Sequence, residues 1–305
     1  MAVTAANLRH SAGLTDGGVY FDCLDPASGA TRPTIIMIHG GAHTGSCYLR
    51  TADGGPGWAY AFAARGHRVV VPDWPGCGRS GFVAPDRLTG ETVVHGLGTL
   101  VASLPPPLVL MTHSMSGAFG WRLLELYAAR IARVVAVAPA PPGNIQPEPE
   151  VLDESDAAVV FKNGAQRIRL DKNALSVADR DFVEHKLVGD GRFFPRDRID
   201  AYTASLLPIA PRLLYERRNI NGSQVRVRDV AALRDKRVLV LTGTNDLDHT
   251  RDADGAIVAW LTAAGAAVDF VYLGDRGIVG NGHMLMLEQN SDAVAALVLD
   301  WLERA

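Results

Sequence analysis

Ser114 has the sequence context of a nucleophile. It follows the apolar run LVLMT (residues 108–112), and the helix-like stretch AFGWRLLELYAAR (118–130) begins soon after it. The sequence THSMSG around it matches the small-x-Ser-x-small pattern of a tight strand-to-helix turn, with Thr112 and Ser116 where glycine is usual. Such a turn strains the serine backbone and raises its hydroxyl above the sheet. A serine at this place can also serve only as a helix cap.

A serine nucleophile needs a base, and His283 is the histidine in the expected place. Where a serine of this kind is catalytic, the chain order is serine, acid, histidine. His283 lies in the glycine-rich segment GNGHMLM (280–286), after the last predicted strand and before the terminal predicted helix. Because glycines precede the histidine, the loop can bend and bring the imidazole back over the edge of the sheet.

Asp246 is the carboxylate predicted to orient His283. It lies three residues beyond Gly243, which ends the apolar run RVLVLTG (237–243). A carboxylate there would accept the Nδ1 proton of the histidine and stabilise the imidazolium that forms when Ser114 loses its proton. Asp248 is the nearest competitor, whereas Asp252 and Asp254 look like acidic residues in the first turn of a helix.

The oxyanion of an acyl-transfer intermediate needs backbone N–H groups directed at one point. The first central apolar run ends in His39-Gly40-Gly41-Ala42-His43, where glycines allow a sharp turn. Gly41 or Ala42, together with the amide of Met115, is therefore predicted to form the oxyanion hole. The HxxxH spacing in this segment is not read as a metal site, because it lies in a glycine turn rather than on a helix.

The elements that would position these residues alternate along the chain. Continuous apolar runs bounded by turn residues are typical of strands buried on both faces. They cover residues 34–39, 68–73, 108–113, 133–139, 237–243 and 268–274. Helix-like stretches lie between them near residues 57–66, 116–130, 252–265 and 291–304. Strand alternating with helix predicts an α/β fold with a doubly wound, mostly parallel sheet.

This alternation is interrupted between residues 141 and 235. A proline-rich exit, APAPPGNIQPEPE, leads there into polar stretches with helical character near residues 176–187 and 198–218. We therefore expect a core domain of residues 1–140 and 236–305, and a helical cap, residues 141–235, inserted after the strand that follows the helix behind Ser114. Large apolar residues in the insertion could line a pocket or form its own core. They are Phe193, Phe194, Tyr202, Leu206, Leu207 and Tyr215.

Composition limits the classes of partner. The 305-residue chain has 30 Lys plus Arg against 33 Asp plus Glu, a net charge of −3, and no long run of either sign. These values favour a small-molecule partner over nucleic acid or an anionic membrane and leave the oligomeric state unknown. The glycine loop at residues 73–80 lacks the features of a phosphate-binding loop, so no cofactor is expected.

Several features favour a cytoplasmic location. No apolar stretch reaches the roughly 18 residues of a membrane span. The first residues, MAVTAANLRHSAG, lack the basic and apolar regions of a signal peptide. Three widely spaced cysteines, Cys23, Cys47 and Cys77, fit a reducing compartment better than a disulfide framework.

Taken together, the motifs resemble those of the α/β-hydrolase superfamily. HGG, DWPGCGRSG, THSMSG, TGTND and GNGHM occur in this order within residues 32–140 and 235–304. The segment TADGGPGW (51–58) is also similar to a TxDGxxGW insertion in a small group of bacterial serine carboxylesterases. In that group the acid is a glutamate just after the strand that follows the serine-bearing helix. Here VAVAPAPPG has no carboxylate at that place, which favours Asp246 and leaves Glu148 or Glu150 as alternatives.

The resemblance implies a serine hydrolase that cleaves a carboxylic ester or lactone of a small organic substrate through an acyl-enzyme. The same triad also serves C–C bond, thioester or amide hydrolysis and acyl transfer. A different class, a cofactor-independent lyase or oxygenase, would use only the His/Asp dyad. A binding module without turnover is the least favoured class, because a full set of catalytic groups is present.

Overall fold

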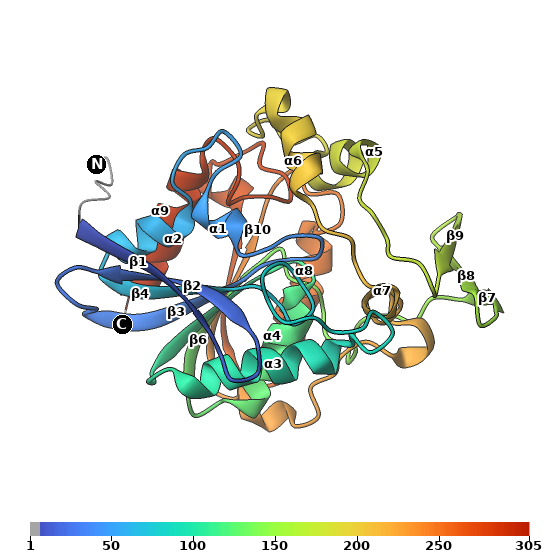
Figure 1. Cartoon of the computed structure of the whole chain (residues 1–305), viewed down its shortest axis with the longest axis horizontal. Coiled ribbons are helices and arrows are strands. Elements are labelled where there is room, and N and C mark those ends of the chain that lie inside the picture. Colours follow the sequence, from blue (N-terminus) through green and yellow to red (C-terminus); the bar gives the residue numbers. More distant parts are fainter. Residues whose placement is uncertain (1–6, 305) are drawn as a thin grey trace.

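A central sheet of eight strands organises the protein, which is described by a computed structural model over residues 7–304 (Figure 1). In spatial order the strands are β1 (Leu8–Leu14), β2 (Tyr20–Pro26), β4 (His67–Pro72), β3 (Arg32–Ile38), β5 (Leu108–His113), β6 (Ile131–Val137), β10 (Arg237–Thr242) and β11 (Ala267–Tyr272). The strands from β4 to β11 are parallel, and β1 and β2 add an antiparallel edge. The predicted doubly wound, mostly parallel sheet is confirmed.

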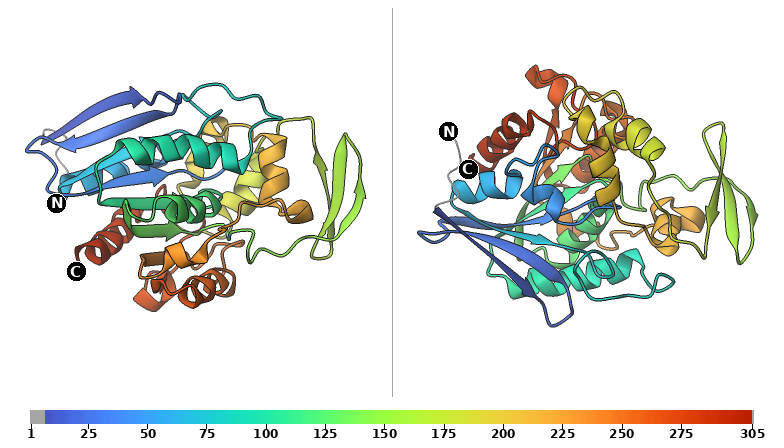
Figure 2. Two further views of the ribbon diagram at one scale, coloured as in Figure 1. Left: turned by 90° about the horizontal axis from the view of Figure 1, so that it is seen from below. Right: turned by 45° about the horizontal axis from the view of Figure 1, so that its top comes forward.

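Helices cover both faces of this sheet (Figure 2). On one face lie α1 (Ser46–Leu49), α2 (Trp58–Ala64) and α9 (Ser291–Glu303), and on the other lie α3 (Gly90–Ser103), α4 (Ser116–Leu126) and α8 (Arg251–Ala263). Successive strand residues point to opposite faces, so Ile35 and Met37 pack in the first core whereas Ile36 and Ile38 pack in the second. Both faces are buried, which explains the uninterrupted apolar runs.

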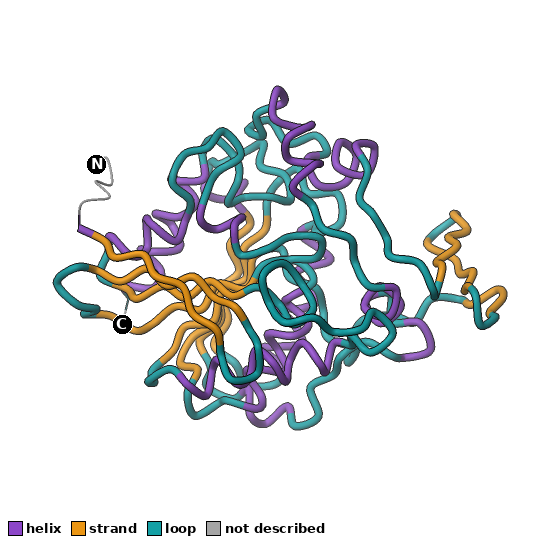
Figure 3. The backbone as a smooth tube through the Cα atoms, viewed as in Figure 1, coloured by secondary structure: helices purple, strands orange, loops and turns teal. Residues whose placement is uncertain are grey.

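The insertion at residues 141–235 is only partly helical. Its helices are α5 (Arg180–Phe182), which continues into a π-helical turn (Val183–Val188), α6 (Ile199–Ser205) and α7 (Pro211–Arg217). The insertion also contains a separate antiparallel sheet, which the sequence analysis did not predict: β7 (Val151–Glu154), β8 (Ala158–Asn163) and β9 (Gln166–Asp171). Figure 3 shows this sheet apart from the central one.

A local signal for this second sheet exists in the sequence. Asn163 pairs with Gln166 across a two-residue turn that begins at Gly164, where φ is +59°. Glycine at the first of two turn residues between strand-like segments indicates a hairpin, because a type II′ turn needs positive φ at that position. The expectation of a helical cap is corrected to a mixed insertion.

The carboxyl ends of the parallel strands meet at one edge of the sheet. Ile38, Pro72, His113 and Thr242 end β3, β4, β5 and β10, and each is followed by a loop with candidate site residues. Ligands of open α/β sheets bind at this edge, because loops from neighbouring strands converge there. The boundaries between core and insertion stay a prediction, and residues 1–6 lie outside the described residues. Within residues 7–304, no helix is long and apolar enough to span a membrane.

Candidate active site

Ser114 lies on a strained turn between β5 and α4. Its φ is +52°, a region that non-glycine residues rarely adopt. Backbone hydrogen bonds to both sides fix the turn: the Ser114 N–H donates to Val137 O (3.1 Å), and Ser114 O accepts from the N–H groups of Gly117 and Ala140 (2.8 Å each). The end of β6 therefore holds this serine in place.

Small residues let α4 approach the sheet. A Cβ on Gly117 would lie 2.6 Å from the Ala140 nitrogen, so only glycine fits there. Ser116 is fully buried and accepts a hydrogen bond from the His113 N–H (2.9 Å). Thr112, which departs from the usual pattern, is accommodated at Gly120, where a Cβ would lie 2.6 Å from the Thr112 methyl carbon.

His283 and Asp246 are brought together as predicted from their positions in the chain. The Nδ1–H of His283 donates to Asp246 Oδ2 at 2.6 Å, and both side chains are almost completely buried. The other carboxylate oxygen, Oδ1, accepts from the backbone N–H groups of Asp248 and His249 (3.0 Å each). Burial raises the pKa of Asp246, but His283 and these donors outweigh it and hold that pKa well below its usual range.

The competing carboxylates have other partners. Asp248 forms an ion pair with Lys186 of the insertion. Glu150 pairs with Lys162 at 2.6 Å on an exposed part of the insertion, and Glu148 lies beside Gly222. Within the described chain, Asp246 is the carboxylate whose oxygen is hydrogen-bonded to His283.

A second histidine–aspartate pair lies beside the first. His249 donates from Nδ1 to Asp254 Oδ1 (2.9 Å), and Asp254 Oδ2 accepts from the Thr242 hydroxyl (2.6 Å). The rings of His249 and His283 are stacked, with centroids 5.2 Å apart. Asp254 does lie in the first turn of α8, as expected, but it is buried and bonded to His249 rather than a surface acid, a role that sequence reasoning missed.

The loop after β3 packs directly on the serine turn. A Cβ on Gly40 would lie 3.0 Å from Ser114 Cβ, and one on Gly41 would lie 2.9 Å from the Met115 side chain. Ala42 has a φ of +61°. Among residues 7–304, neither the Ala42 nor the Met115 amide N–H has a hydrogen-bond acceptor in the protein. Free N–H groups on these two adjoining loops are what an oxyanion hole requires.

The glycine loop after β4 supports the loop after β3. Asp73 is fully buried and accepts hydrogen bonds from the Gly45 N–H (2.8 Å) and from the backbone and side chain of Arg79. The Cys77 thiol donates to His43 O (3.2 Å). Through these contacts residues 73–80 support the candidate oxyanion loop.

Two further histidines contact this arrangement, and sequence reasoning gave them no role. His113 donates from Nε2 to the His283 carbonyl (3.0 Å), while burial and the charge of His283 hold its pKa well below the usual value. His43 donates from Nδ1 to Gly41 O and accepts from the Tyr202 hydroxyl of α6 (2.7 Å each). His113 therefore positions the His283 backbone, and His43 joins the loop after β3 to the insertion.

Glu288 supports the loop that carries His283. It is buried, and its carboxyl oxygens accept hydrogen bonds from the Gly282 N–H (2.6 Å) and from the side chain of Asn281. Burial raises the pKa of Glu288 to about 7, although the hydrogen bonds from Gly282 and Asn281 act in the opposite direction.

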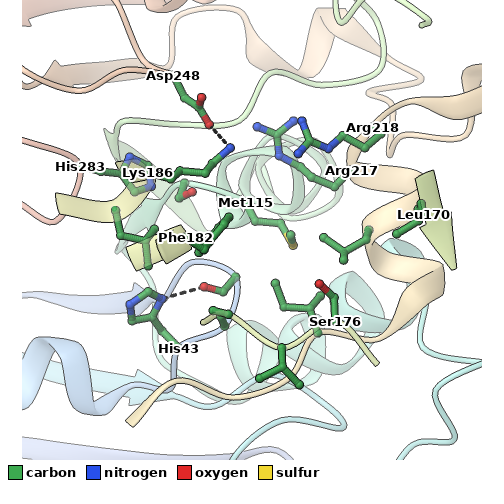
Figure 4. A pocket seen from close by; sticks show the side chains of 18 of the residues that line it. His43, Met115, Leu170, Ser176, Phe182, Lys186, Arg217, Arg218, Asp248 and His283 are labelled. Atoms are coloured by element: carbon green, nitrogen blue, oxygen red, sulfur yellow. Dashed lines mark hydrogen bonds and ion pairs between the residues drawn. The ribbon is translucent and has the colours of Figure 1, made fainter. Parts of the chain in front are cut away.

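A cavity of about 270 Å³ joins the candidate residues to the insertion (Figure 4). Ser114, His283, Gly41, Ala42 and Met115 line it from the core. Apolar residues of the insertion complete its walls, namely Phe161, Ile168, Leu170, Val177, Phe182, Leu187, Ile209 and Leu214. None of these is among the six apolar residues considered from the sequence, of which Leu207 lines a neighbouring cavity and Phe194, Tyr202 and Tyr215 are buried.

Comparisons with known proteins agree with this architecture. A profile described as the alpha/beta hydrolase family matches residues 35–297, and the chain belongs to that family. A probable secreted lipase, phiG, from a fungal species (strain ATCC 74256) is 24% identical, over 90% of this chain and 83% of its own.

Solved structures share the fold at low sequence identity. A serine hydrolase involved in carbazole degradation, the CarC enzyme, has a TM-score of 0.61 at 17% identity, covering 97% of this chain and 98% of its own. An epoxide hydrolase from Vigna radiata has a TM-score of 0.64 at 14% identity, covering 98% and 99%. The expected membership of the superfamily is confirmed, and the protein is a hydrolase of this fold.

Proposed function

We propose that the protein is a serine hydrolase that cleaves an ester or lactone of a small organic acid through an acyl-enzyme, with Ser114, His283 and Asp246 as the catalytic triad. The observation that carries this proposal is the hydrogen bond of 2.6 Å between His283 Nδ1 and Asp246 Oδ2, at a cavity that Ser114 also lines. This bond leaves His283 Nε2 free to act as a base. Lipase and esterase relatives support an ester substrate.

The proposed cycle has two halves. In the first, Ser114 Oγ attacks the carbonyl carbon while its proton passes to His283, and the N–H groups of Ala42 and Met115, with Gly41 alongside, stabilise the oxyanion. His283 then protonates the leaving alcohol oxygen as the C–O bond breaks. In the second half, water gives a proton to His283 and attacks the acyl-enzyme, and His283 returns that proton to Ser114 Oγ as the bond to the acyl group breaks and the acid is released.

The charge states of the groups around His283 explain why this cycle needs no further charged group. Asp246 remains a carboxylate over the working pH range, so it stabilises the imidazolium formed in each half of the cycle. His113 has a lowered pKa and stays neutral beside His283. The imidazolium therefore meets an anion on one side and a neutral ring on another.

Replacing Ser114 with alanine tests the proposal. We expect kcat/KM for p-nitrophenyl butyrate to fall about 10,000-fold or more, because the nucleophile is lost while the fold is kept. A fluorophosphonate should form a covalent adduct on wild-type Ser114 and none on the variant. An unchanged rate, or an adduct elsewhere, would refute the assignment. Retained activity after Ser114→Ala would instead favour the alternative class that uses only the His283/Asp246 dyad.

The reaction type within the serine mechanism is decided by the substrate. Thioester, amide and C–C bond hydrolysis, or transfer of the acyl group to an alcohol, would use the same residues. A panel of matched ester, lactone, thioester and amide substrates ranks these reactions by kcat/KM. We expect esters or lactones to rank first.

A further inference from the structure

The wall of the cavity formed by the insertion is rich in positive charge. Arg169, Lys186, Arg217 and Arg218 line the cavity, against a single aspartate, Asp248. Lys186 is paired with Asp248, and Arg169 lies 3.8 Å from Asp171 outside the cavity. Arg217 and Arg218 form no ion pair with any residue from 7 to 304.

Arg217 and Arg218 are the last residue and the C-cap of α7, and they point into the cavity. Figure 4 shows both guanidinium groups extending toward the part of the cavity where Lys186 meets Asp248. A cation at a helix C-terminus interacts favourably with the helix dipole, but that interaction does not require the side chain to enter a cavity. Among the described residues, the side chain of Arg217 makes one long hydrogen bond, 3.5 Å to Gln146 Oε1.

The surroundings of Arg217 change the pKa of its guanidinium group. Burial, followed by the charge of Arg218, lowers the pKa of Arg217 to about 10, while the charge of Asp248 acts in the opposite direction, so the group remains cationic at neutral pH. Arg217 also opposes the protonation of His249, whose ring stacks on His283. The guanidinium therefore lies within electrostatic reach of the catalytic end of the cavity.

We infer that Arg217 and Arg218 form a subsite for a carboxylate on the substrate, remote from the ester carbonyl that Ser114 attacks. The inference rests on the proposed function and specifies its substrate class: esters or lactones whose acyl part ends in a carboxylate. A planar guanidinium matches a carboxylate in a two-point hydrogen-bonded geometry. The apolar side chains of Leu170 and Leu214 would pack against the intervening methylene groups.

A pair of esters of equal length provides the first test. Mono-p-nitrophenyl glutarate carries the carboxylate, and p-nitrophenyl methyl glutarate replaces it with a neutral methyl ester. We expect wild type to prefer the charged ester at least tenfold in kcat/KM. In Arg217→Met the rate for the charged ester should fall about 10- to 100-fold, as expected for loss of a charge-assisted hydrogen bond, while the neutral ester changes less than about threefold.

Three further variants sharpen this test. Arg217→Lys keeps the charge and should retain part of the preference, and Arg217→Met with Arg218→Met should abolish it. Arg167→Met removes an exposed positive charge from β9 that does not line the cavity, so it should leave the preference unchanged. Melting temperatures of all variants report whether each one folds.

Binding measurements test the carboxylate subsite even if neither ester is hydrolysed. With Ser114→Ala, calorimetry should give at least tenfold tighter binding of monomethyl glutarate than of dimethyl glutarate, and Arg217→Met should remove the difference. Equal binding of the two compounds, or a loss in Arg217→Met that affects both equally, would overturn the inference. Tenfold tighter binding of methyl 4-phosphonobutyrate would overturn the assignment to a carboxylate.

The failures of the two proposals are distinguishable. If hydrolysis depends on Ser114 but the charged and neutral esters react equally fast, the carboxylate subsite is refuted and the serine mechanism is retained. If Ser114→Ala retains hydrolysis, the serine mechanism is refuted. The binding experiment still tests the carboxylate subsite.

Discussion

Two histidine–aspartate pairs lie side by side in the wall of the cavity, and they differ in how the chain builds them. His283 and Asp246 are 37 residues apart and come from different loops. His249 and Asp254 are five residues apart, and Asp254 is anchored to Thr242 at the end of β10. The first pair is made by the convergence of distant segments, whereas the second braces a single strand-loop-helix unit.

The comparison shows that an adjacent carboxylate is not enough to identify a catalytic histidine. Both imidazoles donate to a buried carboxylate and both line the cavity. They differ in their other neighbours, since His113 holds the backbone of His283 and belongs to the same turn as Ser114. We therefore propose that the first pair takes part in catalysis and that the second supports the loop at residues 243–250.

Replacing the two histidines separately should give the largest difference. His283→Ala is expected to lower kcat/KM for a p-nitrophenyl ester about 10,000-fold or more, because the base is lost. His249→Gln should lower it less than about tenfold. Steady-state kinetics measures both, with the melting temperature as a check on folding. Similar losses in the two variants would break the distinction between the pairs.

Substitution of Asp246 should lower kcat more than substitution of Asp254, by a smaller factor than for the two histidines. Asp246→Asn leaves a partner for His283 but favours the wrong tautomer, and we expect kcat to fall about 1,000- to 10,000-fold. Asp254→Asn should change kcat less than about tenfold. If Asp254→Asn proved the more damaging variant at full folding, His249 would be the better candidate for the base.

Glu288, which supports the loop that carries His283, should make the stability of the protein depend on pH. Its pKa of about 7 in the folded protein lies above its ordinary value of 4.5, so its contribution to stability is fully present below pH 4.5 and is lost as the pH rises through 7. The full shift corresponds to a loss on the order of 3 kcal/mol in the free energy of unfolding. Urea unfolding from pH 5 to pH 8.5 should show this decline in wild type and a flatter profile in Glu288→Gln. Parallel profiles would contradict it.

Substitutions in the His249–Asp254 pair should affect the free energy of unfolding more than the catalytic rate. Asp254→Asn is expected to cost about 1–2 kcal/mol of unfolding free energy, because a buried hydrogen bond to a charged group is weakened. The pKa of His249 is raised despite burial, through Asp254 and Asp246. Its stabilising contribution is thus present below pH 6.5 and is lost as the pH rises through the raised pKa, so the difference between wild type and variant should shrink as the pH increases.

Much of the core could be predicted from the sequence, for a physical reason. Strands covered on both faces are largely apolar, so apolar runs identify β3, β4, β5, β6 and β10. The run at β11 also marks a strand, although this strand lies at the edge of the sheet and is only partly buried. The antiparallel strands β1 and β2 were not predicted; β1, at the edge of the sheet, is largely exposed and mixes polar with apolar residues. Helix α3 was also missed, since Gly96 and Gly98 lower its intrinsic helix propensity but allow Pro75 and Tyr127 to pack against it.

Some residues of the candidate site could be predicted from the sequence, and others could not. Ser114, His283 and Asp246 follow from their order on the chain, because each lies just beyond a recognisable strand or in a glycine-rich loop. The roles of His113, Glu288 and Arg217 depend on contacts between segments far apart in the sequence. Their residue types carry no local pattern that distinguishes a buried partner from a surface side chain.

The contact between Thr112 and Gly120 has a consequence for how such sequences change over time. The threonine methyl group occupies the volume that a β-carbon at residue 120 would need, so each residue permits the other. We therefore expect threonine at 112 to be tolerated with glycine at 120, and a larger residue at 120 to require loss of the methyl group at 112. The substitutions at the two positions are thereby coupled, and a motif definition that demands glycine at the first position would overlook chains with this pair.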